Sequence, residues 1–113
     1  MKFTIKYKLD NWNDTINKCR YNKYVANKRK SDEMSVISKF ISNLPKIDKY
    51  PVEIVFKWHI KSYKSDLDNK SEKNILDQLQ KSGILENDSI KYINKITHIA
   101  IKDDDEYVEV EII

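Results

Sequence analysis

The chain of 113 residues is poor in residues that break or cross-link regular structure, with one glycine, two prolines and one cysteine. A single glycine excludes a glycine-rich phosphate loop, and with it most nucleotide-binding enzymes. The lone Cys19 cannot form an internal disulfide, so we expect a reduced, cytoplasmic setting. No run approaches the ~20 apolar residues of a membrane span, and the first residues lack the apolar core of a signal peptide. A cytoplasmic protein without a membrane partner is expected.

Charge is unevenly distributed along the chain. Residues 1–64 carry 15 Lys/Arg against 6 Asp/Glu, a net charge of +9, whereas residues 65–113 carry 6 against 12, a net charge of −6. A basic half joined to an acidic half suits a protein that grips a polyanion with one part and processes it with another. The alternative is solvated surface without a partner, and charge alone does not decide between them.

Apolar periodicity predicts four strands and two main helices in one domain, residues 1–113. The strands are expected near residues 3–9, 52–60, 91–101 and 108–112. The helices are expected from a cap at Ser31 or Asp32 to about residue 41, and over residues 72–81. Residues 10–30 are expected to form a long loop, with at most a short helix. The resulting β-α-β-α-β-β order predicts a small α+β domain on a mixed sheet.

Each expected element has a predicted buried side. The helices should bury Met34, Ile37, Phe40 and Ile41, and then Ile75, Leu76 and Leu79. In the strand at 52–60, His59 falls on the outward side of the alternation. Gly83 follows the second helix at the position that needs a left-handed backbone, so that helix should end there. Three aspartates at 103–105 are expected to form the last turn.

The main candidate site begins with Asp66 and Asp68, which follow the strand at 52–60. On an extended backbone the two carboxylates point the same way and repel unless a cation lies between them. Mg²⁺ is the expected ion, and Mn²⁺ is possible because both prefer oxygen ligands. Asp88 can join them if residues 84–88 run back along the preceding helix to its start. The alternatives are a capped turn for the pair and a simple turn for Asp88.

Basic residues provide candidate phosphate contacts. Lys73, near the start of the second helix, could steady a phosphate beside the carboxylates, or pair with Asp77 four residues further on. Glu72 competes with Lys73 for that place. A basic segment interleaved with Tyr21 and Tyr24 suits nucleic acid, because lysines neutralise phosphates and rings stack on bases. The predicted DNA-binding residues are Lys18, Arg20, Lys23, Lys28, Arg29 and Lys30. The alternative is a solvated loop.

The central third of the chain resembles the RusA family of Holliday-junction resolvases. The matching stretches are Asp66-Leu67-Asp68-Asn69, Lys73-Asn74-Ile75-Leu76-Asp77-Gln78-Leu79 and Gly83-Ile84-Leu85-Glu86-Asn87-Asp88. This resemblance implies that Asp66, Asp68 and Asp88 are metal-binding catalytic carboxylates and that Lys73 is the essential lysine. It also implies a homodimer of small mixed α/β domains, a metal-dependent endodeoxyribonuclease that makes paired symmetric nicks in four-way DNA junctions during recombination and repair. The rival hypothesis is a non-catalytic DNA-binding module of the same fold.

The chain departs from the family pattern at two positions. One extra residue precedes the lysine, so Glu72 stands at the usual lysine spacing counted from Asp66. One residue turns a helical side chain by about 100°, so either Lys73 or Glu72 could face the metal. Asn87 replaces the first member of an Asp pair, which leaves Asp88 as the single strong candidate there.

Overall fold

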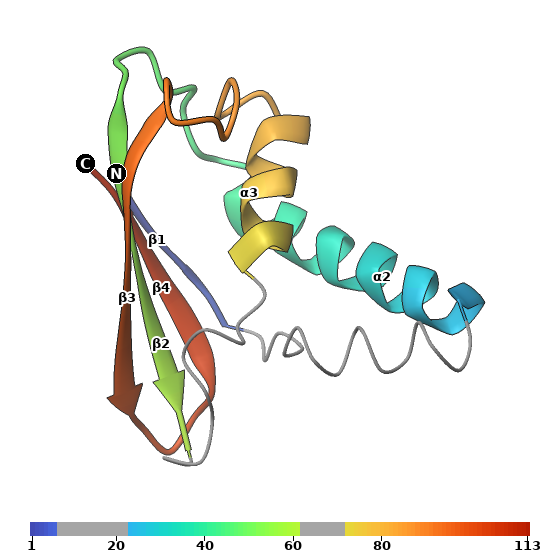
Figure 1. Ribbon diagram of the computed structural model, residues 1–113. Helices are drawn as coiled ribbons and strands as arrows, with labels where there is room; N and C mark the ends of the chain where they lie inside the picture. Colours follow the sequence, from blue (N-terminus) through green and yellow to red (C-terminus); the bar gives the residue numbers. More distant parts are fainter. Residues whose placement is uncertain (7–22, 62–71) are drawn as a thin grey trace.

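The computed structural model of the protein is a four-stranded sheet with two helices on one face (Figure 1). It describes residues 1–6, 23–61 and 72–113, and only the backbone of residues 23–31. The strands are β1 (Lys2–Ile5), β2 (Val52–Ile60), β3 (Ile93–Lys102) and β4 (Tyr107–Ile112), in the order β1-β4-β2-β3. β2 and β3 are parallel, and β4 is antiparallel to β1 and β2. The predicted α+β class, mixed sheet and element order are confirmed.

The sheet buries one face because its strands alternate apolar and polar residues with a period of two. The apolar members point toward the helices, and Phe56 at the centre of β2 is fully buried. The Phe56 ring stacks on Trp58 with centroids 5.7 Å apart. The other strand residues buried in this core are Ile5, Val52, Ile54, Ile60, Ile93, Val108, Val110 and Ile112. Alternation in the sequence predicts an inward side for both β2 and β4, and the structure confirms it. The predicted inward residues are Val52, Ile54, Phe56, Trp58, Ile60, Val108, Val110 and Ile112.

The first helix, α2 (Lys23–Ile41), is longer than the sequence pattern predicts. Its backbone is helical from Lys23, so the expected start at Ser31 or Asp32 is wrong and both residues lie inside the helix. A serine and an aspartate favour a cap only weakly over a helix interior, and no glycine or proline interrupts residues 23–41. Among the described residues, no helix is long and apolar enough to cross a membrane.

The buried side of α2 differs from the prediction at one position. Met34, Ile37 and Ile41 are buried as expected, but Phe40 is 39% exposed. Phe40 lies about 100° around the helix from Ile41, which turns it away from the sheet.

The second helix, α3 (Glu72–Lys81), has the predicted bounds and the predicted buried face. Ile75 and Leu79 are fully buried and Leu76 is 7% exposed. Gly83 has a φ of 74° and ends the helix as expected. Its N–H bonds to the Gln80 carbonyl at 3.0 Å and the Ile84 N–H bonds to the Leu79 carbonyl at 3.0 Å. These two bonds form a Schellman cap, which satisfies carbonyls that the helix leaves open.

Candidate functional site

The predicted site residues fall partly outside the described residues. Asp66, Asp68, Lys18 and Arg20 lie there. The remaining predicted DNA-binding residues lie on the N-terminal half of α2, where the backbone is helical instead of the expected loop. These are Lys23, Lys28, Arg29 and Lys30.

Lys73 lies in the first turn of α3 and is exposed, whereas the neighbouring Glu72 is half-buried. Helical periodicity puts Glu72 on the side of Ile75 and Leu79, three and seven residues further on. Lys73 shares its side with Asp77 instead. Of the two competing residues, Lys73 is the one that presents its charge to solvent, where a phosphate can reach it.

Asp88 lies in the loop that joins α3 to β3, and its side chain is exposed. Of the two paths that the sequence leaves open for residues 84–88, the hydrogen bonds at the start of this segment favour a turn beside the end of α3. The Leu85 N–H bonds to the Leu79 carbonyl at 3.1 Å, and the Glu86 N–H bonds to the Tyr50 hydroxyl at 3.0 Å. The Schellman cap thus directs the chain toward the start of β2, and Figure 1 shows this loop beside the last turn of α3.

The consequence is a separation of two predicted site residues along the helix. Asp88 is associated with the C-terminal end of α3 and Lys73 with its N-terminal turn. From Lys73 to Ser82 the helix axis advances by about 14 Å. The loop that carries Asp88 therefore begins at the end of α3 that lies away from Lys73.

A buried polar pair that sequence analysis missed joins α2 to the first turn of α3. The Asn74 side-chain amide donates a hydrogen bond to Glu33 Oε2 at 2.7 Å. Glu33 is 6% exposed and Asn74 is 7% exposed. The signal was present in the sequence, because Glu33 shares a helical stripe with Ile37 and Ile41 at intervals of four.

A second missed cluster surrounds His59 on the face of the sheet opposite the helices. The residue was expected to face outward into solvent, but it is only 7% exposed. Its Nδ1 lies 2.9 Å from Asp103 Oδ2 and its Nε2 lies 3.0 Å from Glu109 Oε1. The ring also stacks on Tyr107 with centroids 4.0 Å apart.

This cluster also holds the turn between β3 and β4. The Asp103 N–H bonds to the Ile60 carbonyl at 2.9 Å, and Asp103 Oδ1 accepts from the Asp105 N–H at 3.3 Å. The Asp105 N–H, and then the His59 ring, hold the pKa of Asp103 below its usual value. Burial, and then the Asp103 charge, raise the pKa of Tyr107. The predicted turn at residues 103–105 is thus confirmed. The sequence pattern did not reveal that His59 contacts this turn through Asp103.

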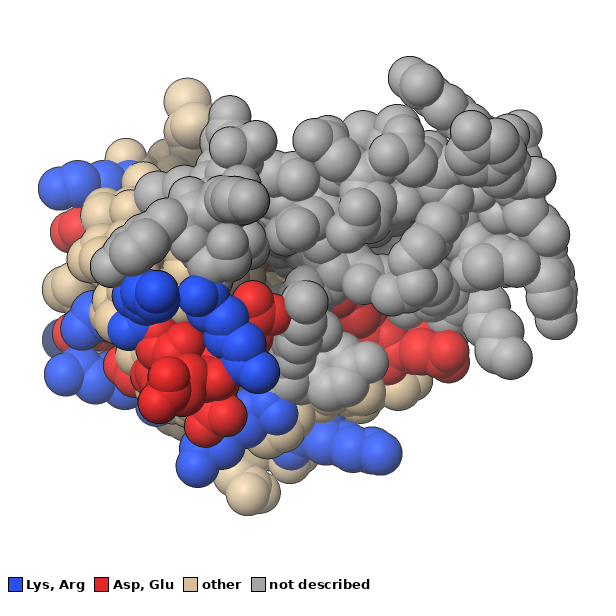
Figure 2. Space-filling view, turned by 90° about the horizontal axis from the view of Figure 1, so that it is seen from below, with Lys and Arg blue, Asp and Glu red and all other residues tan. Residues whose placement is uncertain are grey.

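The surface at this turn is acidic but not uniformly so. The turn lies at the lower end of Figure 1, and Figure 2 views the molecule from that side, where acidic side chains gather with basic ones around them. Asp104 and Asp105 are exposed, and Lys61 and Lys102 of the adjoining strand ends are exposed too. Oppositely charged neighbours screen this patch, so charge alone gives it no clear partner.

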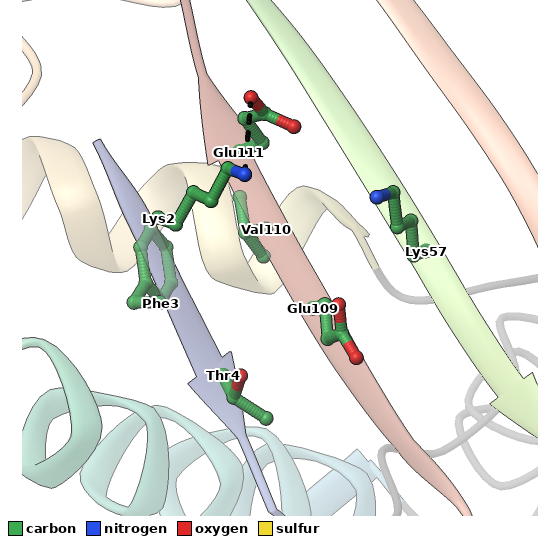
Figure 3. A pocket seen from close by; sticks show the side chains of 7 residues that line it. All are labelled: Lys2, Phe3, Thr4, Lys57, Glu109, Val110 and Glu111. Carbon is green, nitrogen blue, oxygen red and sulfur yellow. Dashed lines mark ion pairs between the residues drawn. The ribbon is translucent and has the colours of Figure 1, made fainter.

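A shallow hollow of about 200 Å³ lies over β1, β4 and β2 on the outer face of the sheet (Figure 3). Its charged lining consists of Lys2, Lys57, Glu109 and Glu111, and Lys2 Nζ lies 3.9 Å from Glu111 Oε1. Two lysines and two glutamates balance each other. The hollow therefore lacks the excess positive charge that a phosphate backbone requires.

The described residues include one of the three predicted metal ligands. In residues 1–6, 23–61 and 72–113, no three His, Cys, Asp or Glu side chains form a group that could hold a metal ion. Of the predicted ligands, this part of the chain contains only Asp88. The donor set of three carboxylates is nevertheless the oxygen chemistry that Mg²⁺ prefers.

Comparison with known proteins adds no further constraint. No protein-family model matches the chain, and no curated protein matches it significantly. The functional proposal therefore depends on the pattern of acidic and basic residues around α3 and on the geometry of that helix.

Proposed function

We propose that the protein is a Mg²⁺-dependent endodeoxyribonuclease that resolves four-way DNA junctions by paired nicks. The observation that carries this proposal is the exposed Lys73 in the first turn of α3. Asp68 precedes Glu72 by four residues, so the predicted carboxylates adjoin that turn in the sequence. The ordered pattern of Asp66, Asp68, Lys73 and Asp88, which resembles the RusA family, supplies the reaction class.

Each part of the chain has a role in this proposal. The carboxylates of Asp66, Asp68 and Asp88 would hold Mg²⁺, which supplies Lewis acidity at the phosphate and lowers the pKa of bound water. The Lys73 ammonium would stabilise negative charge that develops on the scissile phosphate. Basic residues at the start of α2 would neutralise the DNA backbone. Paired symmetric nicks require two related sites, so the active form would be a cytoplasmic homodimer.

A non-catalytic DNA-binding module is the second candidate. One specific observation favours it, namely that the loop carrying Asp88 is bonded through Leu85 to the last turn of α3, whereas Lys73 lies in the first turn. In this candidate the basic half of the chain would still bind DNA, while the carboxylates would only shape the surface.

Cleavage of a synthetic four-way junction separates the two candidates. The wild type, Asp68→Asn and the control Asp104→Asn, which alters an exposed turn residue, are incubated with the junction and Mg²⁺ or Mn²⁺. We expect paired nicks from the wild type and the control, and binding with at least 100-fold slower cleavage from Asp68→Asn. Wild-type protein that binds without cutting in either metal would establish the binding module. Wild-type protein that neither binds nor cuts would contradict both candidates.

A further inference from the structure

We propose that Glu33 is a positioning residue of the nuclease site, which fixes the first turn of α3 so that Lys73 points outward. This inference rests on the proposed function. It assigns a role to a carboxylate on α2, outside the region that carries the predicted catalytic residues.

The contact between the two helices is short, buried and directional. Asn74 Nδ2 lies 2.7 Å from Glu33 Oε2, and each residue is more than nine-tenths buried. Asn74 directly follows Lys73 in the first turn of α3. Because the amide must point at α2 to make this bond, the rotation of the whole turn is constrained, and Lys73 is held about 100° away from that direction.

Apolar packing opposes rotation of this helix as well. Ile75, Leu76 and Leu79 anchor α3 to the core and would lose burial if the helix turned. A turn of about 100° would exchange the directions of Lys73 and Glu72, which is the ambiguity that the extra residue creates. The Glu33–Asn74 bond opposes this exchange, because breaking it leaves buried polar groups without a partner.

Glu33 is a charged residue at a buried position between α2 and α3. Burying a charge is costly, and an apolar pair at this position would also join the two helices. Glu33 lies against the first turn of α3, where the Asn74 side-chain amide donates to its carboxylate. It has further interactions besides the one with Asn74. The buried charge of Glu33 therefore has partners. Its role, in this inference, is to orient the first turn of α3 more than to stabilise the fold.

Exchanging the two functional groups tests the inference. Asn74→Asp removes the donor and places two carboxylates in contact, whereas Glu33→Gln keeps an acceptor for Asn74. The double variant Glu33→Gln/Asn74→Asp restores a donor and an acceptor in the reverse order. Gln78→Glu is the matched control, because it makes the same amide-to-acid change in α3 at a less buried position.

The readouts are the single-turnover cleavage rate of the junction, the dissociation constant for the junction, and the urea unfolding midpoint. We expect Asn74→Asp to slow cleavage at least tenfold at unchanged junction affinity. The double variant should recover to within about threefold of wild type, as should Glu33→Gln and Gln78→Glu.

Two results would overturn the inference while leaving the proposed function intact. One is an Asn74→Asp variant that cuts like wild type. The other is an Asn74→Asp variant whose cleavage rate falls only in proportion to its junction affinity and stability, and that the double variant does not rescue. This result would make Glu33 a purely structural residue. A wild-type protein that does not cut at all would instead contradict the proposed function, and the inference with it.

Discussion

The protein contains two buried polar clusters, and they differ in what lies beside them. Between the helices, Glu33 binds one neutral amide next to the exposed Lys73. On the outer face of the sheet, His59 lies between the carboxylates of Asp103 and Glu109, at the end of β2. The first cluster orients a helix turn that carries a proposed catalytic residue, and the second closes the end of the sheet. We therefore expect changes near the first to alter cleavage and changes in the second to alter stability.

The largest effect is expected from Lys73→Ala. Removing a charge that stabilises the scissile phosphate should slow junction cleavage by at least 100-fold, or about 3 kcal/mol. The free energy of unfolding should hardly change because the side chain is exposed. Cleavage and urea unfolding are measured together, with Lys81→Ala in the last turn of the same helix as the control. If Glu72→Ala abolished cleavage and Lys73→Ala did not, the assignment of the two residues would be reversed.

His59→Phe should lower the stability of the protein and leave the cleavage rate unchanged, the opposite of Lys73→Ala. Phenylalanine retains a ring to stack on Tyr107 but removes both nitrogens that face Asp103 and Glu109. We expect a loss of about 1–2 kcal/mol in the free energy of unfolding, because the two carboxylates are partly exposed and water can replace the lost bonds in part. The cleavage rate per folded molecule should remain unchanged. A strong loss of cleavage without a loss of stability would remove the distinction between the two clusters.

Local signals in the sequence predicted the parts of the fold that depend on nearest neighbours. Gly83 could be identified as the end of α3 because its backbone conformation is costly for other residues. The strand faces followed from simple alternation. The start of α2 was wrong because Ser31 and Asp32 resemble a cap, while nothing in residues 23–30 forbids a helix.

The sequence indicates that Glu33 lies on the buried stripe of α2, but the pairing within each buried cluster could not be predicted, because the partners are distant in sequence. Glu33 and Asn74 are 41 residues apart, and His59 lies 44 residues from Asp103 and 50 from Glu109. Alternation placed His59 outward, which is the correct side of the sheet, but only the register with β4 supplies the groups that bury it. The path of the loop that carries Asp88 could not be predicted for a similar reason, since it depends on a contact between Glu86 and Tyr50, which are 36 residues apart.

Gly83→Ala should have a smaller effect than either substitution above. A Cβ at this position meets no atom within 4 Å, so only the strain of a positive φ opposes alanine. We expect a loss of about 1 kcal/mol in the free energy of unfolding. Gly83→Asn should lose less, because asparagine tolerates this backbone conformation better. Unchanged cleavage in both variants would show that the last turn of α3, unlike the first, contributes only stability.

The smallest effect concerns the pH dependence of stability at the His59 cluster. The pKa of Asp103 is lowered in the folded state, so its contribution is present above the unfolded value of 3.8 and is lost as the pH falls through the lower folded pKa. The pKa of Tyr107 is raised above 10.0, so its contribution is present below that value and is lost as the pH rises through the folded pKa. Urea midpoints measured across both windows should fall at each extreme. In Asp103→Asn the urea midpoint should fall less as the pH is lowered. Its fall at high pH should also be smaller, because the Asp103 charge helps to raise the pKa of Tyr107. An unchanged acid slope in Asp103→Asn would assign the acid sensitivity to other carboxylates and leave His59 as a stacking residue alone.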